Sequence, residues 1–101
     1  MEKSEVTEKT EIIKNKLAEC LSINKDLIGI SEPVFHSGGY EFEVEINMEI
    51  PQNNLRTFRL INYTFPIGKL SESGFEYEGE YYTFDQFNSF LKRTSEEIKE
   101  Q

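Results

Sequence analysis

The chain has one cysteine, one histidine and no tryptophan among its 101 residues. Cys20 has no second cysteine with which to form an internal disulfide. A tetrahedral zinc site is nearly excluded, because it needs four ligands that are mostly cysteine and histidine. The acid-rich loop with a central glycine that binds calcium is missing too. We therefore expect neither a metal nor another cofactor.

Long apolar runs are also missing. No stretch approaches the roughly 18 apolar residues of a membrane-spanning helix. Met1 is followed by Glu2 and Lys3 instead of the apolar segment of a secretory signal. An unpaired cysteine is typical of a reducing compartment. These absences predict a cytoplasmic protein that does not insert into membranes.

Basic residues are scarce and unevenly placed. The chain has 11 Lys and Arg against 19 Asp and Glu, for a formal net charge of −8. Residues 26–50 and 71–85 contain acids and no Lys or Arg, whereas residues 51–70 contain bases and no acid. Acidic blocks repel phosphate backbones and anionic lipid. Direct binding of nucleic acid is therefore disfavoured, and a basic protein surface, such as that of a nucleic-acid-binding protein, is the expected partner.

The clearest pattern lies in residues 40–50. Apolar side chains occupy the even positions, and the odd positions carry Glu41, Glu43, Glu45, Asn47 and Glu49. A period of two is typical of a β-strand with one buried face. On the other face, carboxylates two residues apart lie about 6.6 Å from each other. This spacing favours contact with a cationic partner.

The flanking segments predict an α+β fold. Periodicity and turn residues indicate a helix at 5–22, an edge strand at 27–35, strands at 40–50 and 55–65, a hairpin at 75–82 and a helix from 83. Ser4 is the expected N-cap of the first helix, and Thr83 with Gln86 predicts a capping box at the second. We expect a two-layer sandwich in which an antiparallel sheet, a three-stranded meander plus a short hairpin, is flanked by the helices in the order α-β-β-β-β-β-α. It forms one acidic domain over residues 1–101, frayed at 1–4 and 95–101.

Strand 55–65 is harder to orient. Phe58 and Leu60 fall on one face, and the positions of opposite parity are also apolar: Leu55, Ile61, Tyr63 and Phe65. Either a bulge near residues 60–61 switches the buried face or both faces are partly covered. Arg56 and Arg59 lie on this strand, so we expect at least one of them to pair with a glutamate of the neighbouring strand.

Catalytic residues are not indicated. Cys20 lies on the apolar stripe of the first helix, where a free cysteine is usually a small buried side chain. His36 is expected in a loop, apart from it. Gly38 and Gly39 lack the spacing of a phosphate-binding loop. We therefore expect no enzyme, and a small enzyme with a carboxylate site stays the third alternative.

The favoured function is a non-enzymatic module that presents an acidic sheet face to a basic partner. Its most specific form is a small inhibitor that imitates DNA and occludes a nucleic-acid-binding groove, as counter-defence proteins do. Duplex DNA carries one charge per about 1.7 Å of axis, so one strand of glutamates is too dilute without further acids on the same surface. The candidate partner-binding residues are Glu41, Glu43, Glu45, Glu49, Glu76, Glu78 and Glu80.

Two other interpretations stay open. The glutamate row is equally typical of an ordinary solvated face of an antiparallel sheet. In the second interpretation, the chain is a structural domain that forms homodimers through a sheet edge or through its aromatic hairpin. In that hairpin, we expect Phe75, Tyr77 and one of Tyr81 and Tyr82 to pack under the C-terminal helix instead.

Overall fold

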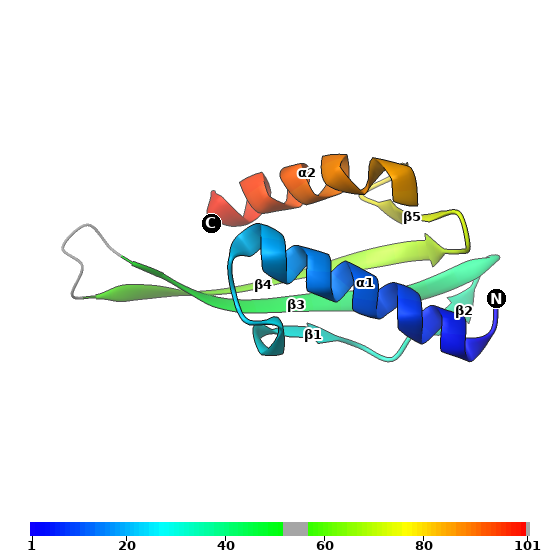
Figure 1. Cartoon of the computed structure of the whole chain (residues 1–101), viewed down its shortest axis with the longest axis horizontal. Coiled ribbons are helices and arrows are strands. Elements are labelled where there is room, and N and C mark those ends of the chain that lie inside the picture. Colours follow the sequence, from blue (N-terminus) through cyan, green and yellow to red (C-terminus); the bar gives the residue numbers. More distant parts are fainter. Residues whose placement is uncertain (52–56, 101) are drawn as a thin grey trace.

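A computed structural model of the chain describes residues 1–51 and 57–100. In these ranges two helices pack on one antiparallel sheet, and Figure 1 shows their arrangement. The helices are α1 (Lys3–Leu21) and α2 (Phe87–Lys99), and the 3₁₀ turns are Lys25–Leu27 and Phe84–Gln86. The strands are β1 (Ile28–Ile30), β2 (Val34–His36), β3 (Gly39–Pro51), β4 (Phe58–Leu70), β5 (Gly74–Tyr77) and β6 (Glu80–Thr83). The α+β class and the predicted layers are confirmed, with the expected edge strand divided into β1 and β2.

The sheet is built around the pairing of β3 with β4. Its strand order is β1-β3-β4-β5-β6, and β2 pairs with the same strand, β3, as β1 does. The break between β1 and β2 falls at Ser31–Pro33, because a proline cannot donate to a strand ladder. Both helices lie on one side of the sheet, and the β3–β4 ribbon runs past their ends (Figure 1). We call the opposite side of the sheet the open face.

The alternation predicted for residues 40–50 is confirmed. Phe42, Val44 and Ile46 point towards the helices and are at most 4% exposed. The intervening positions, which carry Glu41, Glu43, Glu45 and Glu49, are exposed on the open face. One period-two sequence therefore supplies the core and the acidic surface together.

The aromatic hairpin contributes mainly to the core. Phe75 and Tyr77 are fully buried, and Tyr82 is nearly so. The ring of Phe75 lies edge-on to that of Phe90 in α2, with the centroids 4.8 Å apart. Tyr81 is the tyrosine that remains exposed, at 48%. The prediction that one of the two tyrosines packs under the C-terminal helix is therefore confirmed.

The structure differs from the expectation for strand 55–65. No bulge occurs near residues 60–61, because β4 pairs regularly with β3 from Phe58 to Ile67. Phe58 and Leu60 instead lie on the open face, 56% and 76% exposed, while Ile61 is buried on the helix side. The irregularity lies at the other end of β3, between Tyr40 and Phe42. The strand is therefore apolar on both faces, with Ile61 in the core and Phe58 and Leu60 exposed.

The expected cross-strand pair between glutamate and arginine is wrong for Arg59. Arg59 lies directly opposite Ile50, and residues opposite each other share a face. It therefore points away from the glutamate row. Arg56 lies outside the described residues. The register of β4 against β3, which the sequence did not determine, therefore keeps Arg59 from neutralising the glutamate row.

The helix ends follow local chemistry only in part. The capping box of Thr83 and Gln86 is present, with the Thr83 amide donating to Gln86 Oε1 at 3.1 Å. It opens the 3₁₀ turn that leads into α2. The predicted N-cap at Ser4 is wrong, since α1 begins at Lys3 with Glu2 as its N-cap. The predicted fraying from residue 95 is also not seen, because α2 continues to Lys99 and buries Ile98 completely.

Gly74 is a position where the fold has no room for a side chain. A Cβ there would lie 2.1 Å from the carbonyl oxygen of Tyr82, so the backbone of β6 must shift. We expect Gly74→Ala to lower the free energy of unfolding by about 2 to 3 kcal/mol, measured by urea titration.

Gly68→Ala is the matched control, because Gly68 also lies in the sheet but has nothing within 4 Å of its Cβ position. Its free energy of unfolding should change by less than about 1 kcal/mol. Equal stability of the two variants would contradict the close approach of β5 and β6.

Candidate partner-binding surface

The glutamate row on β3 has neutral neighbours on β4. Glu43 lies opposite Pro66, Glu45 opposite Thr64 and Glu49 opposite Leu60. Among the described residues, no Lys or Arg forms an ion pair with any of these three carboxylates. The row therefore keeps its charge on the surface of the domain.

Two polar contacts order the row without neutralising it fully. Glu41 Oε1 lies 2.8 Å from Nδ1 of His36, and both side chains are more than half exposed. His36 occupies the end of β2 instead of the loop that we expected. Glu45 accepts a hydrogen bond from the amide of Asn47 at 3.2 Å. Because exposed contacts of this kind contribute little stability, the carboxylates are free to exchange them for a partner.

A hollow of about 880 Å³ lies on the open face where β3, β4 and the β5–β6 turn meet. Among the described residues, its lining includes no Lys or Arg, and the small residues Pro66 and Gly68 of β4 contribute to it. Val34, which is 61% exposed, adds an apolar wall. The carboxylates around it come from three separate segments: Glu32, the pair Glu41 and Glu43, and the pair Glu76 and Glu78 of the β5–β6 hairpin. We call this feature the acidic hollow.

The structure brings only some of the predicted residues together. Glu76 and Glu78 join Glu41 and Glu43 in the acidic hollow, whereas Glu45 and Glu49 lie further along β3. Glu80 is outside it. Glu78 reaches the hollow because the tight turn at Glu78 and Gly79, both with positive φ, folds the hairpin back on itself.

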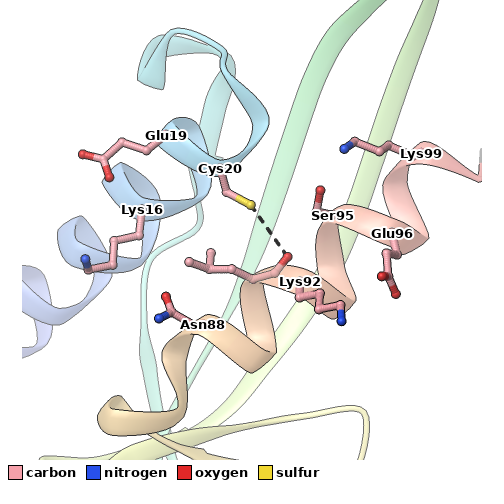
Figure 2. A pocket seen from close by; sticks show the side chains of 9 residues that line it. Lys16, Glu19, Cys20, Asn88, Lys92, Ser95, Glu96 and Lys99 are labelled. Carbon is pink, nitrogen blue, oxygen red and sulfur yellow. Dashed lines mark hydrogen bonds between the residues drawn. The ribbon is translucent and has the colours of Figure 1, made fainter.

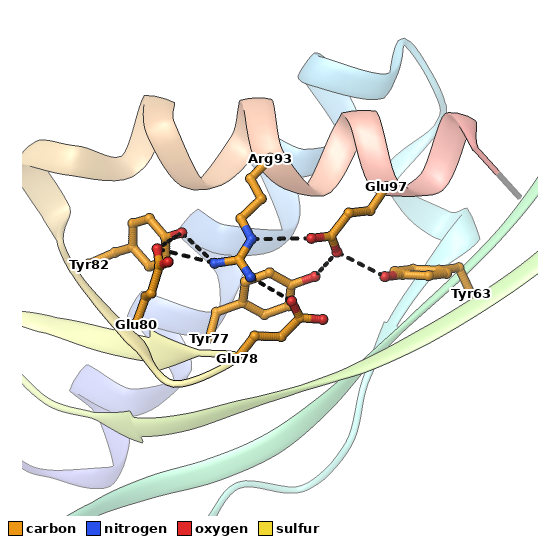
Figure 3. Close-up of polar contacts among 7 residues, drawn as sticks. All are labelled: Tyr63, Tyr77, Glu78, Glu80, Tyr82, Arg93 and Glu97. Atoms are coloured by element: carbon orange, nitrogen blue, oxygen red, sulfur yellow. Dashed lines mark hydrogen bonds and ion pairs between the residues drawn. The ribbon is translucent and has the colours of Figure 1, made fainter.

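Arg93 of α2 neutralises one end of the hairpin, as Figure 3 shows. Its guanidinium contacts Glu78 at 2.6 Å, Glu80 at 3.2 Å and Glu97 at 3.1 Å. It also donates to the hydroxyl of Tyr82 at 3.0 Å. The i, i+4 spacing of Arg93 and Glu97 was visible in the sequence, but the link to the hairpin was not. Of the charged residues in the acidic hollow, Arg93 thus holds Glu78, while Lys69 of β4 lies 3.4 Å from Glu76.

Glu97 is the hub of the same network. The hydroxyls of Tyr63 and Tyr77 both donate to its Oε2, the former at 3.1 Å. Burial alone would raise the pKa of Glu97, but hydrogen bonds from Tyr77, Arg93 and Tyr63 and the guanidinium charge together hold it below its usual range. Burial and the bond to Glu97 raise the pKa of Tyr77. The network is therefore a structural clamp between α2 and the sheet.

A second hollow separates α1 from α2 and exposes Cys20 (Figure 2). The expectation that this thiol is buried is wrong, because Cys20 lies at the edge of the apolar stripe, beside the fully packed Leu17 and Leu21. Its Sγ is 3.9 Å from the carbonyl oxygen of Leu91. His36 does not line this hollow. A thiol–imidazole site is therefore not assembled here.

Comparisons with known proteins add no functional information. No protein-family model matches the sequence, and neither the curated proteins nor the solved structures gave a significant match. Across residues 1–51 and 57–100, no group of three or more His, Cys, Asp or Glu side chains is placed to hold a metal ion. Within the same ranges, neither helix has the length and apolar character needed to cross a membrane. The surface must be interpreted from its own geometry.

The lowered pKa of Glu97 makes the clamp sensitive to acid. The pKa of Glu97 is lower in the folded than in the unfolded chain, so its charge stabilises the fold at pH values above the unfolded pKa of about 4.3. This stabilisation is lost as the pH falls through the folded pKa. We expect Glu97→Gln to lower the free energy of unfolding at pH 7 by about 1 to 2 kcal/mol. Urea titrations at decreasing pH should show this difference closing below about pH 4.3.

Glu96→Gln is the control on the same helix, since Glu96 is exposed. Its effect at pH 7 should stay within about 0.5 kcal/mol. A deficit of Glu97→Gln that is constant down to pH 3 would mean that the amide disturbs packing and that the charge contributes nothing.

Proposed function

We propose that the chain is a non-enzymatic protein-binding module whose open face receives a basic partner surface. The observation that carries the proposal is the acidic hollow, in which carboxylates from three segments surround small and apolar residues and the described lining contains no Lys or Arg. A solvated face needs no such convergence. The complementary partner carries Lys or Arg side chains around an apolar one.

Charged and apolar side chains make different contributions to such a contact. Exposed carboxylates such as Glu41 and Glu43 attract the partner and set its orientation, since electrostatic complementarity mainly raises the association rate and specificity. Val34 and Pro66, both exposed, offer the apolar area that holds the complex together. The helices occupy the other side of the sheet (Figure 1), so a partner reaches the described part of the open face without displacing a helix.

A more specific form of the proposal is an inhibitor that fills a nucleic-acid-binding groove. Carboxylates along one strand are spaced at about 6.6 Å, which is wider than the charge spacing of DNA at about 1.7 Å. Glu76 and Glu78 add a second line of carboxylates beside Glu41 and Glu43. Both are partly neutralised, since Lys69 lies 3.4 Å from Glu76 and Arg93 lies 2.6 Å from Glu78. Arg93 also contacts Glu80 at 3.2 Å, so the imitation of DNA rests mainly on Glu41 and Glu43 at the hollow.

Reversal of the row tests the proposal. The tagged protein and its Glu41→Lys/Glu43→Lys/Glu45→Lys variant are used to capture partners from a native lysate at low and high salt. We expect the wild type to retain a basic protein whose recovery falls at least tenfold in the variant and in high salt, because exposed charge contacts are screened. Mass spectrometry identifies and quantifies the partner.

A variant with the same change in net charge on the helix side provides the control. Glu8, Glu11 and Glu19 are exposed on α1, and their joint substitution by Lys should leave capture intact. Loss in both variants, or in neither, would sink the proposal.

The inhibitor form needs a separate measurement. The purified partner is mixed with labelled duplex DNA, and the wild-type chain is added. Displacement of the DNA supports the inhibitor, whereas a complex that holds both the chain and the DNA rejects the inhibitor and keeps the binding module.

A further inference from the structure

In the part of the chain that the structure describes, the β3–β4 ribbon leaves a long strand edge without a neighbouring strand. β5 pairs with β4 only where Gly68 lies opposite Glu76. In the described ranges, no strand is therefore paired with the outer edge of β4 between Phe58 and Ile67. An unpaired edge presents a row of backbone donors and acceptors to any strand of suitable length.

The hydrogen bonds of β3 with its two neighbours determine which backbone amides and carbonyls of β4 point outwards. The Ser31 amide donates to the Glu43 carbonyl at 3.0 Å, and the Glu43 amide donates to Ser31 Oγ at 2.8 Å, so the backbone of Glu43 faces away from β4. Since this direction alternates along a strand, residues 44, 46 and 48 bond to β4. Their partners are residues 65, 63 and 61. The amides and carbonyls of Leu60, Asn62 and Thr64 consequently point outwards.

The other edges of the sheet are protected by known devices. The β1–β2 edge is interrupted at Pro33, and β6 is only four residues long. The free part of β3 beyond Ile46 carries the charge of Glu49. Prolines, charges, bulges and short strands all discourage edge pairing. β4 has none of these between Leu60 and Phe65.

The same stretch is unusually apolar and free of acid. Phe58 and Leu60 are 56% and 76% exposed beside the free edge. The charged side chains of β4 are Arg59 and Lys69 alone, although the whole chain has a formal net charge of −8. Two copies of so acidic a chain repel each other over most of their surface. The electrostatic repulsion between two copies is smallest where they meet through surfaces without carboxylates.

We propose that β4 pairs edge to edge with β4 of a second copy of this chain, forming a closed dimer. A two-fold axis makes identical strands run antiparallel and uses up both copies of the edge, so the assembly stops at two. Leu60, Asn62 and Thr64 supply the backbone hydrogen bonds, and Phe58 and Leu60 supply apolar contact. The proposal does not depend on the basic partner, because it uses backbone and apolar groups outside the acidic hollow.

Sedimentation and hydrogen exchange test the dimer together. We expect the sedimentation mass to double between about 1 μM and about 1 mM, and the transition to shift to lower concentration in high salt, because salt screens the acidic repulsion. The amides of Leu60, Asn62 and Thr64 should become protected from exchange only in the dimer. Those of Ile61 and Tyr63 should be protected at every concentration, since they bond to β3.

Two variants at one position separate the backbone from the side chain. Asn62→Pro removes an outward N–H, which an edge strand tolerates, and should weaken dimerisation at least tenfold. Asn62→Ala keeps the N–H, loses the same side-chain bond to Asn47, and should still dimerise. If the proline variant does not fold, Leu60→Lys replaces it, since a cation at both copies of the edge disfavours pairing.

Three outcomes would overturn the proposal. One is a monomer at all concentrations. Another is a dimer without the alternating protection of residues 60, 62 and 64. The last is a polymer that grows without limit, because only identical edges paired about a two-fold axis close. A dimer that persists while charge reversal leaves capture unchanged would reject the proposed function and keep this inference.

Discussion

The pairing of β3 with β4 is the interaction on which the rest of the structure depends. Its register decides which side chains share a face, because a slip by one residue would exchange the two faces of a strand. In this register, Phe42, Val44 and Ile46 enter the core and the glutamates of β3 face Pro66, Thr64 and Leu60. The acidic surface is therefore a direct product of the contact that builds the core.

The distribution of arginine divides the acidic residues into two groups. Arg93 holds Glu78, Glu80 and Glu97, so these carboxylates help to fasten α2 to the sheet. The row on β3 has no such cation among the described residues. The carboxylates that Arg93 contacts thus stabilise the fold, whereas those of the β3 row stay available for contact with a partner. Composition alone would have treated all of them alike.

Sequence reasoning succeeded where the cause is local and failed where it depends on distance in space. The period of residues 40–50 and the capping box at Thr83 are set by neighbours in the chain, and both were predicted. Cys20 was misplaced because its exposure depends on how α1 and α2 pack against each other, which leaves a hollow at the thiol. The facing of Leu60 and the orientation of Arg59 both depend on the register of β4 against β3, which no local signal sets. The contacts of Arg93 with the hairpin join segments for which a single sequence gives no spacing rule.

The placement of both helices at the ends of the chain has a consequence for the order of folding. The β3–β4 and β5–β6 pairs are hairpins of residues close in sequence, so their loop-closure cost is small. The helix layer joins α1 to α2 across nearly the whole chain, and such long-range contacts form late. We therefore expect the ribbon to fold first and to stay exposed on both faces until the two ends of the chain meet above it. The slowest step in folding is then the closure of the seam between the helices.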